Sequence, residues 1–384
     1  MHGTIESTCR VEWRGLAELG SIAAQWRELA ARVLEPNVFY EPPFVSAAAP
    51  AFGKDVGAHL VWSRAGPPRL LGFFPARVER RRYGILLPVL VGWTHPYAPL
   101  GSPLVDREAA DAVLQAWLDH LAEEPQFPKL VLLPYLPAEG ELSAAFDGAL
   151  ARRGGKSALF GRHARALLAP GEARDTYLVR ALDGKKRKEL RRQRKRMHEL
   201  GTVTSVTAST AAALGPALDD FLALEASGWK GRARTAANCD DRIASFMQEA
   251  LTALAREGKA QVMQLRRDAE PIAALIILRS GDTAWCWKIA YDEAYGRFSP
   301  GVQLVLDATD MLLRDHAIAR ADSCATPDHP MIDHVWRERL MVADRLLCLD
   351  AQGSRAFALA RALEEVRRAA IRGAKAARDM ARRR

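Results

Sequence analysis

The chain has 384 residues, of which 49% are hydrophobic, 26% charged and 7% aromatic, and its formal net charge is +9. This composition is typical of a globular protein that is long enough for two domains with buried cores. No run approaches the roughly 18–20 apolar residues of a membrane-spanning helix. The first fifteen residues also lack the basic, apolar and small-residue order of a signal peptide. We therefore expect a cytoplasmic protein.

The five cysteines form no CxxC pair, and an odd number scattered over a long chain argues against a disulfide framework. We expect all of them to be reduced thiols.

The positive charge is concentrated in two segments. Residues 185–196 (KKRKELRRQRKR) carry net +8 and residues 351–384 carry net +7, so the rest of the chain is net −6. An anionic partner is therefore expected only where these two segments lie.

The first half of the chain alternates between strand and helix patterns. Strands are predicted at residues 4–13, 58–63, 69–79, 85–93, 129–134 and 156–168, and helices at 16–34, 108–124 and 141–152.

The second half repeats this architecture without visible sequence repetition. Strands are predicted at residues 202–208, 260–266, 271–279, 282–291, 320–324 and 342–349, and helices at 185–200, 216–227, 242–256, 299–316 and 331–339. The short connections RDAE and SG suit an antiparallel meander, and one strand-helix-strand crossover follows it. Each half therefore predicts an α/β (α+β) domain with a mixed, mostly antiparallel sheet flanked by helices. Turn chemistry at Pro170-Gly171 predicts domains at 1–170 and 171–350, with a basic helical tail at 351–384.

Three segments of the second half carry a family resemblance. FLALEASGWKG (221–231), FSPGVQLVLDAT (298–309) and DSCATPDHPMIDHVWRERL (322–340) resemble the CelD/Fem-like branch of the GNAT acyltransferase superfamily. The motifs of this resemblance lie within residues 175–350, whereas the first 170 residues share only the order of strands and helices. The resemblance implies two tandem GNAT-like domains.

The crossover helix is the expected donor site. A helix N-terminus with glycine in its first turn presents free N–H groups and a positive dipole end to a pyrophosphate, and Ser299 is the expected N-cap with Pro300 at the first helical position. GNAT enzymes hold coenzyme A at this crossover, which implies acyl-CoA or acetyl-CoA as co-substrate. Arg297, Ser299, Gly301 and Val302 would bind it. The proline departs from the usual glycine-rich pattern, and Fem-type members use aminoacyl-tRNA as donor.

Acid-base candidates lie in the two other segments. Glu225 would be a general base if burial raises its pKa, or a structural partner of Lys230. His329 would be an acid-base group or an oxyanion donor, and Asp322 is the third catalytic candidate. For the acceptor site we expect Trp229, Lys230, Lys288, Tyr291, Asp328, His334 and Trp336.

Two alternatives remain for residues 322–334. A metal site is disfavoured because Cys324-x4-His329-x4-His334 has no recognised zinc spacing, so we expect no metal. A covalent mechanism through Cys324 is disfavoured because GNAT-type transfer proceeds by direct attack.

The helix at 185–200 has a narrow apolar stripe and nine cations, which either face solvent or bind a polyanion such as tRNA or anionic lipid. The chain lacks GxxxxGK[ST], HExxH and GxSxG motifs. We therefore expect an acyltransferase acting on an amine or hydroxyl of a small molecule or cell-envelope precursor. An aminoacyl-tRNA-dependent transferase and a non-catalytic anion- or RNA-binding protein are the alternatives.

Overall fold

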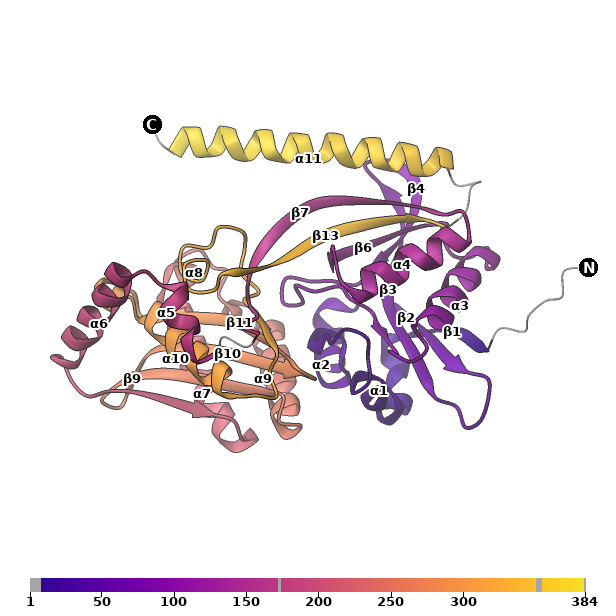
Figure 1. Cartoon of the computed structure of the whole chain (residues 1–384). Coiled ribbons are helices and arrows are strands. Elements are labelled where there is room, and N and C mark those ends of the chain that lie inside the picture. The colour runs from indigo at the N-terminus through magenta and orange to yellow at the C-terminus, as the bar shows by residue number, and fades with distance from the viewer. Residues whose placement is uncertain (1–7, 172–173, 350–353, 383–384) are drawn as a thin grey trace, which may run out of the picture. The chain divides into compact units, whose positions relative to one another are not determined.

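The computed structural model describes residues 8–171, 174–349 and 354–382, and the chain divides into two compact units (Figure 1). Unit 1 comprises Met1–Tyr40, Gly53–His163 and Met341–Arg384, and unit 2 comprises Glu41–Phe52 and Ala164–Leu340. Residues 4–7 of the first expected strand, 350–353 at the expected boundary and 383–384 of the expected tail lie outside the described residues.

Unit 1 begins with a four-stranded antiparallel meander followed by a crossover. The meander strands are β1 (Cys9–Gly15), β2 (Gly57–Ser63), β3 (Leu70–Arg82) and β4 (Ile85–Gly92). Helix α3 (Ala110–Glu123) then leads to β6 (Leu130–Pro137), which pairs with β4 in parallel. The remaining elements are η1 (Leu16–Ile22), α1 (Ala23–Ala30), η2 (Val38–Tyr40), the short β5 (Leu104–Val105) beside β3, and α4 (Glu141–Arg152).

Unit 2 repeats the same order of strand pairings. Its meander strands are β8 (Val203–Ala208), β9 (Ala260–Arg267), β10 (Glu270–Ser280) and β11 (Thr283–Tyr291). Helix α10 (Pro300–Arg314) then leads to β12 (Arg320–Asp322), which pairs with β11 in parallel. The repeat of architecture predicted from the sequence is therefore present in the pairing of the strands.

The last strand of each half of the sequence completes the sheet of the other half. β7 (Lys156–Leu168) pairs antiparallel with β12 through Leu167 and Leu168, and β13 (Glu338–Cys348) pairs antiparallel with β6 from Val342 to Cys348. The units therefore differ from the expected ranges 1–170, 171–350 and 351–384. The physical reason is that strand pairing, and not the turn at Pro170-Gly171, decides where these strands belong.

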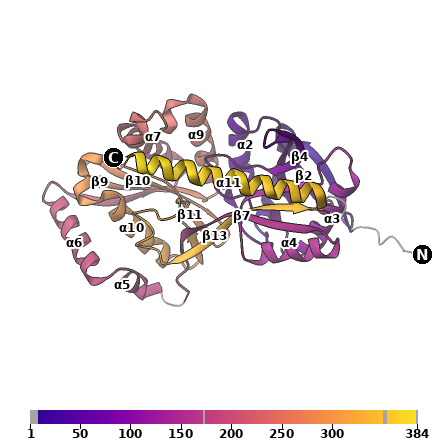
Figure 2. The same cartoon turned by 90° about the horizontal axis from the view of Figure 1, so that it is seen from above.

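Helices cover both faces of the unit 2 strands (Figure 2). On one face, α10 packs through Leu304, Ala308 and Leu312 in a core that includes Leu275 and Ile277 of β10. The opposite face is covered by α7 (Ala211–Ser227) and α9 (Asp241–Arg256), and Trp287 of β11 meets Phe246 there. The side-chain alternation of the strands thus separates two cores, as expected for a sheet buried on both sides.

Two local expectations were wrong. Residues 331–335 form turns and not a helix, and the chain is already in β13 from Glu338. Ile332, Val335 and Trp336 have helical spacing but are buried by the packing of this turn against the α10 core. In addition, α2 (Pro42–Phe52) is a buried helix of unit 2 for which no helix was predicted, because Pro42, Pro43 and Pro50 interrupt the pattern.

Four further segments complete the described elements of unit 2: η3 (Arg174–Thr176), α5 (Tyr177–Ala181), α8 (Trp229–Arg232) and η4 (Ala237–Cys239). The long helix α11 (Ser354–Arg382) belongs to unit 1 and is held there by the buried Glu364. Glu364 accepts hydrogen bonds from the Tyr83 hydroxyl at 2.6 Å and from the Arg367 guanidinium at 2.9 Å. Among the described residues, no helix is both long and apolar enough to cross a membrane.

Candidate functional site

The N-terminus of α10 has the expected N-cap residue, but without the capping hydrogen bond of its side chain. Ser299 occupies the N-cap position with Pro300 directly after it, but its backbone is left-handed (φ 53°, ψ 53°) and its side chain makes no capping hydrogen bond. The left-handed residue joins α10 to the preceding short helix η5 (Glu293–Phe298), whose end it also caps. The positive end of the α10 dipole is therefore retained, while the hydroxyl of Ser299 stays available.

Gly301 lies against two side chains of unit 2. A β-carbon on Gly301 would lie 2.8 Å from Cε of Met331 and 3.2 Å from Cδ1 of Tyr291. The turn after β12 therefore covers this glycine on one side, and a side chain here would require the flexible end of Met331 to move. The expectation that Gly301 helps to hold the donor stays a prediction. Val302 lies next to it, half-buried against the same core.

Arg297 lies beside the basic helix α6 (Gly184–His198). Arg297 stacks over the Phe298 ring at 4.7 Å and lines a pocket of about 260 Å³ together with Arg192 and Arg196 of α6. Glu189 also lines this pocket, but its carboxylate forms hydrogen bonds with Arg192 at 2.8 and 2.9 Å. Three arginines thus line one pocket next to the start of α10, and one of them is paired with Glu189.

Helix α6 is fixed to α10 by two specific contacts. Gln303 of α10 donates a hydrogen bond to the Leu190 carbonyl at 2.9 Å, and Asp307 pairs with Arg194 at 2.8 Å. Leu190 and Met197 are buried as the narrow stripe predicted, whereas Leu200 is exposed and lies beyond the helix end. The basic face of α6 is therefore held at a defined position in unit 2.

Strand β11 contains a bulge at the centre of the unit. Ile276 of β10 pairs with Lys288 while Ile277 pairs with Cys286, so Trp287 is the extra residue. β11 and β12 pair only over Thr283–Trp285, and β11 then continues to Tyr291 after β12 has ended. Lys288 therefore lies in the part of β11 that has separated from its parallel neighbour.

Lys288 is a half-buried cation whose pKa is lowered. Burial, and to a smaller extent the nearby Lys230 ammonium, lower the pKa of Lys288 to about 8, while the Glu225 carboxylate acts in the opposite direction. Lysine at this pKa is mostly charged at neutral pH and gives up its proton readily. A perturbed, desolvated lysine is typical of a functional site.

Glu225 is buried at the C-terminal end of α7 with both carboxylate oxygens engaged. Oε1 accepts a hydrogen bond from Lys230 Nζ at 2.6 Å, and Oε2 accepts one from the Ala237 backbone N–H at 2.8 Å. These bonds tie α8 and the short helix η4 to α7. The structural role that the sequence allowed for Glu225 is thus present, and its role as a general base stays a prediction.

A small hollow of about 40 Å³ lies beside this carboxylate. Its walls include Glu225, Lys230, Tyr291 and Glu293, and Trp229 forms its rim with 60% of its surface exposed. Three of the expected acceptor-site residues therefore meet here.

Asp322 lies in a buried polar cluster at the end of β12. Its Oδ1 accepts a hydrogen bond from the Cys324 backbone N–H at 2.9 Å, and its Oδ2 lies 3.4 Å from the Arg165 guanidinium. Burial and the Asp322 charge raise the pKa of the Cys324 thiol well above its usual value. Cys324 is therefore a neutral thiol, which argues against a covalent mechanism through it. Arg165 was missed because a single arginine in a strand pattern gives no signal.

The remaining expected residues are spread along the turn after β12. Burial lowers the pKa of His329, whose Nδ1 accepts a long hydrogen bond of 3.4 Å from the Met331 backbone N–H, so its Nε2 carries the proton. Asp328 and His334 are exposed. Trp336 is fully buried and donates to the Thr309 hydroxyl at 2.9 Å. An acceptor-binding role for Trp336 was therefore wrong, because it offers no surface to a ligand.

In the described parts of the chain, no three His, Cys, Asp or Glu side chains are grouped so that they could hold a metal ion.

The comparisons with known proteins bear on the same unit. Residues 184–327 match the family model of the acetyltransferase (GNAT) domain. No curated protein matches the chain significantly. This matched range includes α6, Glu225, Lys288, the start of α10 and Asp322, and it is less than half of the chain.

Solved structures resemble the chain over most of its length. FemX is similar with a TM-score of 0.58 and 10% identity, covering 86% of this chain and 96% of that one. A C-terminal domain (DUF2156) assigned to a lysylphosphatidylglycerol synthetase of Agrobacterium fabrum is similar with a TM-score of 0.53 and 13% identity, covering 89% and 95%. At these identities the likeness shows the fold alone. The resemblance predicted from the sequence is confirmed: residues 184–327 match the GNAT domain model, and the chain has the fold of FemX.

Proposed function

We propose that the protein transfers an acyl group from acyl-coenzyme A to an amine or hydroxyl acceptor. The observation that carries this proposal is the GNAT domain at residues 184–327, in which the α10 N-terminus lies beside a pocket lined by Arg192, Arg196 and Arg297. A helix N-terminus and a group of guanidinium ions both favour phosphate oxygens. These residues therefore fit the phosphates of acyl-coenzyme A, which when bound would supply the acyl group as an activated thioester.

The contact at Gly301 affects how the donor is held. Because Met331 and Tyr291 cover this glycine, the donor phosphates would meet the side of the helix end that faces α6 and Arg297. The hydroxyl of Ser299 and the first N–H groups of α10 would contribute there.

Lys288 is the residue best suited to the chemistry. Its ammonium lies in the separated part of β11 and is mostly desolvated, so it would stabilise negative charge that develops on a carbonyl oxygen. The proton on His329 Nε2 makes this histidine a second hydrogen-bond donor. The Glu225–Lys230 pair would position Lys288 through its charges, and Trp229 would form a wall for the acceptor.

A second candidate is an aminoacyl-tRNA-dependent transferase. It is favoured by the position of α6, whose cations are fixed beside the proposed donor site and suit a longer polyanion. The acceptor in either case would be a small molecule or a cell-envelope precursor in the cytoplasm.

Native mass spectrometry of the full chain with coenzyme A, acetyl-coenzyme A or aminoacyl-tRNA separates the two. We expect retention of coenzyme A or its acyl thioester, and a loss of retention in Arg297→Gln but not in the exposed Arg234→Gln, which does not line the pocket. Retention of aminoacyl-tRNA with no binding of either coenzyme A species would instead establish the second candidate. Binding of none of the three would overturn both.

A further inference from the structure

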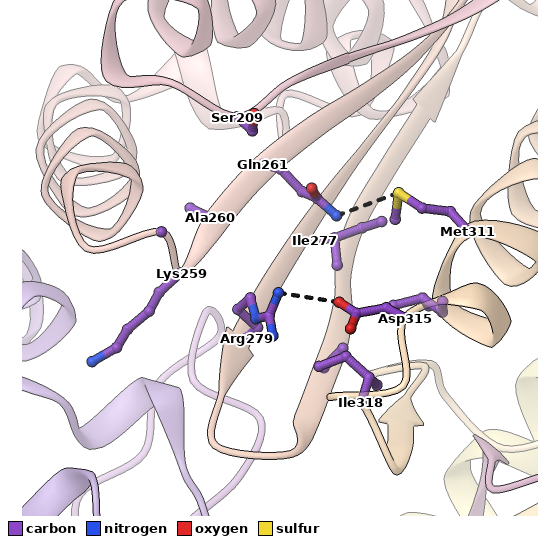
Figure 3. A pocket seen from close by; sticks show the side chains of 12 residues that line it. Ser209, Lys259, Ala260, Gln261, Ile277, Arg279, Met311, Asp315 and Ile318 are labelled. Carbon is purple, nitrogen blue, oxygen red and sulfur yellow. Dashed lines mark hydrogen bonds and ion pairs between the residues drawn. The ribbon is translucent and has the colours of Figure 1, made fainter.

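A cavity in unit 2 lies at the end of α10 that is remote from the proposed donor site. Its volume is about 290 Å³, and it is bounded by the start of β9, the end of β10, the start of β11 and the last turn of α10 (Figure 3). Ten to fourteen residues of α10 separate it from Gly301, which corresponds to about 15–21 Å along the helix axis. The cavity is therefore too far away to be part of the acyl-transfer site.

The floor of the cavity is apolar and its mouth is charged. Ile277, Ala284, Leu312 and Ile318 line it and are at most 4% exposed. At the mouth, the Arg279 guanidinium pairs with the Asp315 carboxylate at 3.2 Å, as the dashed line in Figure 3 shows. A ligand that fills this space would therefore carry an apolar group and a charged end.

The ion pair at the mouth can be opened at little cost. The side chains of Arg279 and Asp315 are 39% and 38% exposed, and pairs this exposed contribute only about 0–1 kcal/mol to stability. A single guanidinium nitrogen of Arg279 contacts Asp315, and a guanidinium offers five N–H donors. Arg279 is therefore able to bind a carboxylate, and Asp315 an ammonium group.

The neighbouring groups support these roles of Arg279 and Asp315. Asp315 is the residue directly after α10, where the helix dipole is negative and favours a cation. The nearby Lys259 does not compete for an anion at the mouth, because its ammonium lies 2.5 Å from Glu41 and 3.0 Å from Glu257 and points away from the cavity (Figure 3). The positive side of the mouth is thus provided by Arg279.

We propose that this cavity binds a free α-amino acid with an apolar side chain. Arg279 would bind the carboxylate, Asp315 would bind the ammonium group, and the side chain would enter the apolar floor. The two protein charges are in contact, so the two ligand charges must also be adjacent, as they are on one α-carbon. A volume just below the roughly 300–1,000 Å³ of pockets for drug-sized ligands suits a molecule of this size.

Isothermal titration calorimetry of the full chain with L-leucine tests the proposal without any acyl donor, so its outcome is independent of the proposed function. We expect saturable binding of L-leucine that is at least tenfold tighter than binding of glycine. We also expect no measurable binding of isopentylamine, 4-methylpentanoate or 6-aminohexanoate, which lack the carboxylate, the ammonium group or their adjacency. Equal binding of glycine, or of either singly charged analogue, would overturn it, as would no heat with L-leucine at millimolar concentration.

Variants locate the site. Arg279→Gln and Asp315→Asn should each weaken L-leucine binding at least tenfold, and the asparagine keeps an acceptor for the Ala317 N–H that Asp315 caps at 3.0 Å. The matched controls are Arg314→Gln and Asp310→Asn, because these residues form a 2.7 Å ion pair on α10 outside the cavity. Controls that lose binding equally, or site variants that keep it while thermal unfolding shows them folded, would refute the assignment.

Discussion

Lys288 is the residue at which the proposed function opposes stability most directly. An ammonium group that is mostly removed from water destabilises the folded chain, and its pKa of about 8 measures that effect. The bulge in β11 precedes Lys288, and the charges of Lys230 and Glu225 lie near its ammonium group. Such a residue is expected at a catalytic centre and not in a structural core.

We expect Lys288→Met to lower turnover by about two to three orders of magnitude, the size observed when a donor to a developing oxyanion is removed. The same variant should be at least as stable as the wild type at pH 7, because methionine removes the buried charge and keeps the volume. Turnover and chemical denaturation measure the two effects. A clear loss of stability with unchanged turnover would assign Lys288 a structural role.

The pH dependence provides an independent test of the same residue. Between pH 8 and 10.5 the unfolded lysine keeps its proton while the folded one loses it, so the Lys288 contribution to stability rises with pH over this range. The stability advantage of Lys288→Met should therefore shrink as the pH increases from 8 to 10. Turnover of the wild type should fall over the same pH range if the ammonium is the active form. A constant difference in stability across this range would contradict the lowered pKa.

Glu225→Gln addresses the other candidate residue. The glutamine can still accept one hydrogen bond but no longer neutralises Lys230, so we expect a loss of stability of about 1–3 kcal/mol. The control is Glu293→Gln, an exposed carboxylate that pairs with Arg232 at 2.7 Å and should cost less. If turnover instead falls by about two to four orders at unchanged melting temperature, Glu225 is the general base.

At the scale of elements, contacts with α10 hold α6 at one position in unit 2, and the sequence of α6 alone does not predict these contacts. The stripe of Leu190 and Met197 predicted one buried face, but nothing in the run of cations indicated which helix it would cover. The Arg194–Asp307 pair and the Gln303 hydrogen bond make that choice. Two of the nine cations thereby reach the pocket with Arg297.

This position predicts different effects for different cations of α6. The double variant Arg192→Gln/Arg196→Gln should weaken binding of coenzyme A or tRNA and flatten its dependence on salt, because fewer counterions are released. Arg191→Gln/Lys195→Gln has the same spacing and charge change but lies outside the pocket, and should have the smaller effect. Affinity measured over a range of salt concentrations would distinguish the pairs. Equal effects would mean that α6 acts only through its total charge.

The sequence predicted most of the strands and helices because their patterns are local. The meander of unit 2 follows from alternation and short turns, including Gly281 with φ 53° between β10 and β11. The turn at 331–335 was misread because three apolar residues at helical spacing are buried by tertiary packing. The bulge at Trp287, which positions Lys288, depends on the register with β10 and has no signature in one strand alone.

At the scale of the whole molecule, the final strands predict that neither half of the sequence folds as a separate unit. β7 from the first half pairs with β12 of the second, and β13 from the second half pairs with β6 of the first. Pairing partners this far apart in the sequence cannot be identified from local patterns. The division at Pro170-Gly171 is therefore a boundary in the sequence and not in the pairing of the strands.

The exchanged strands lead to a prediction about fragments. Residues 1–170 expressed alone would lack β13 and leave β6 without its antiparallel partner, and residues 171–384 alone would leave β12 without β7. Unpaired strand edges promote aggregation, so we expect both fragments to be insoluble or unfolded by circular dichroism. Co-expression should restore soluble protein, because each fragment supplies the strand that the other lacks. A soluble, cooperatively folded 171–384 fragment would show that β7 is dispensable for the GNAT domain.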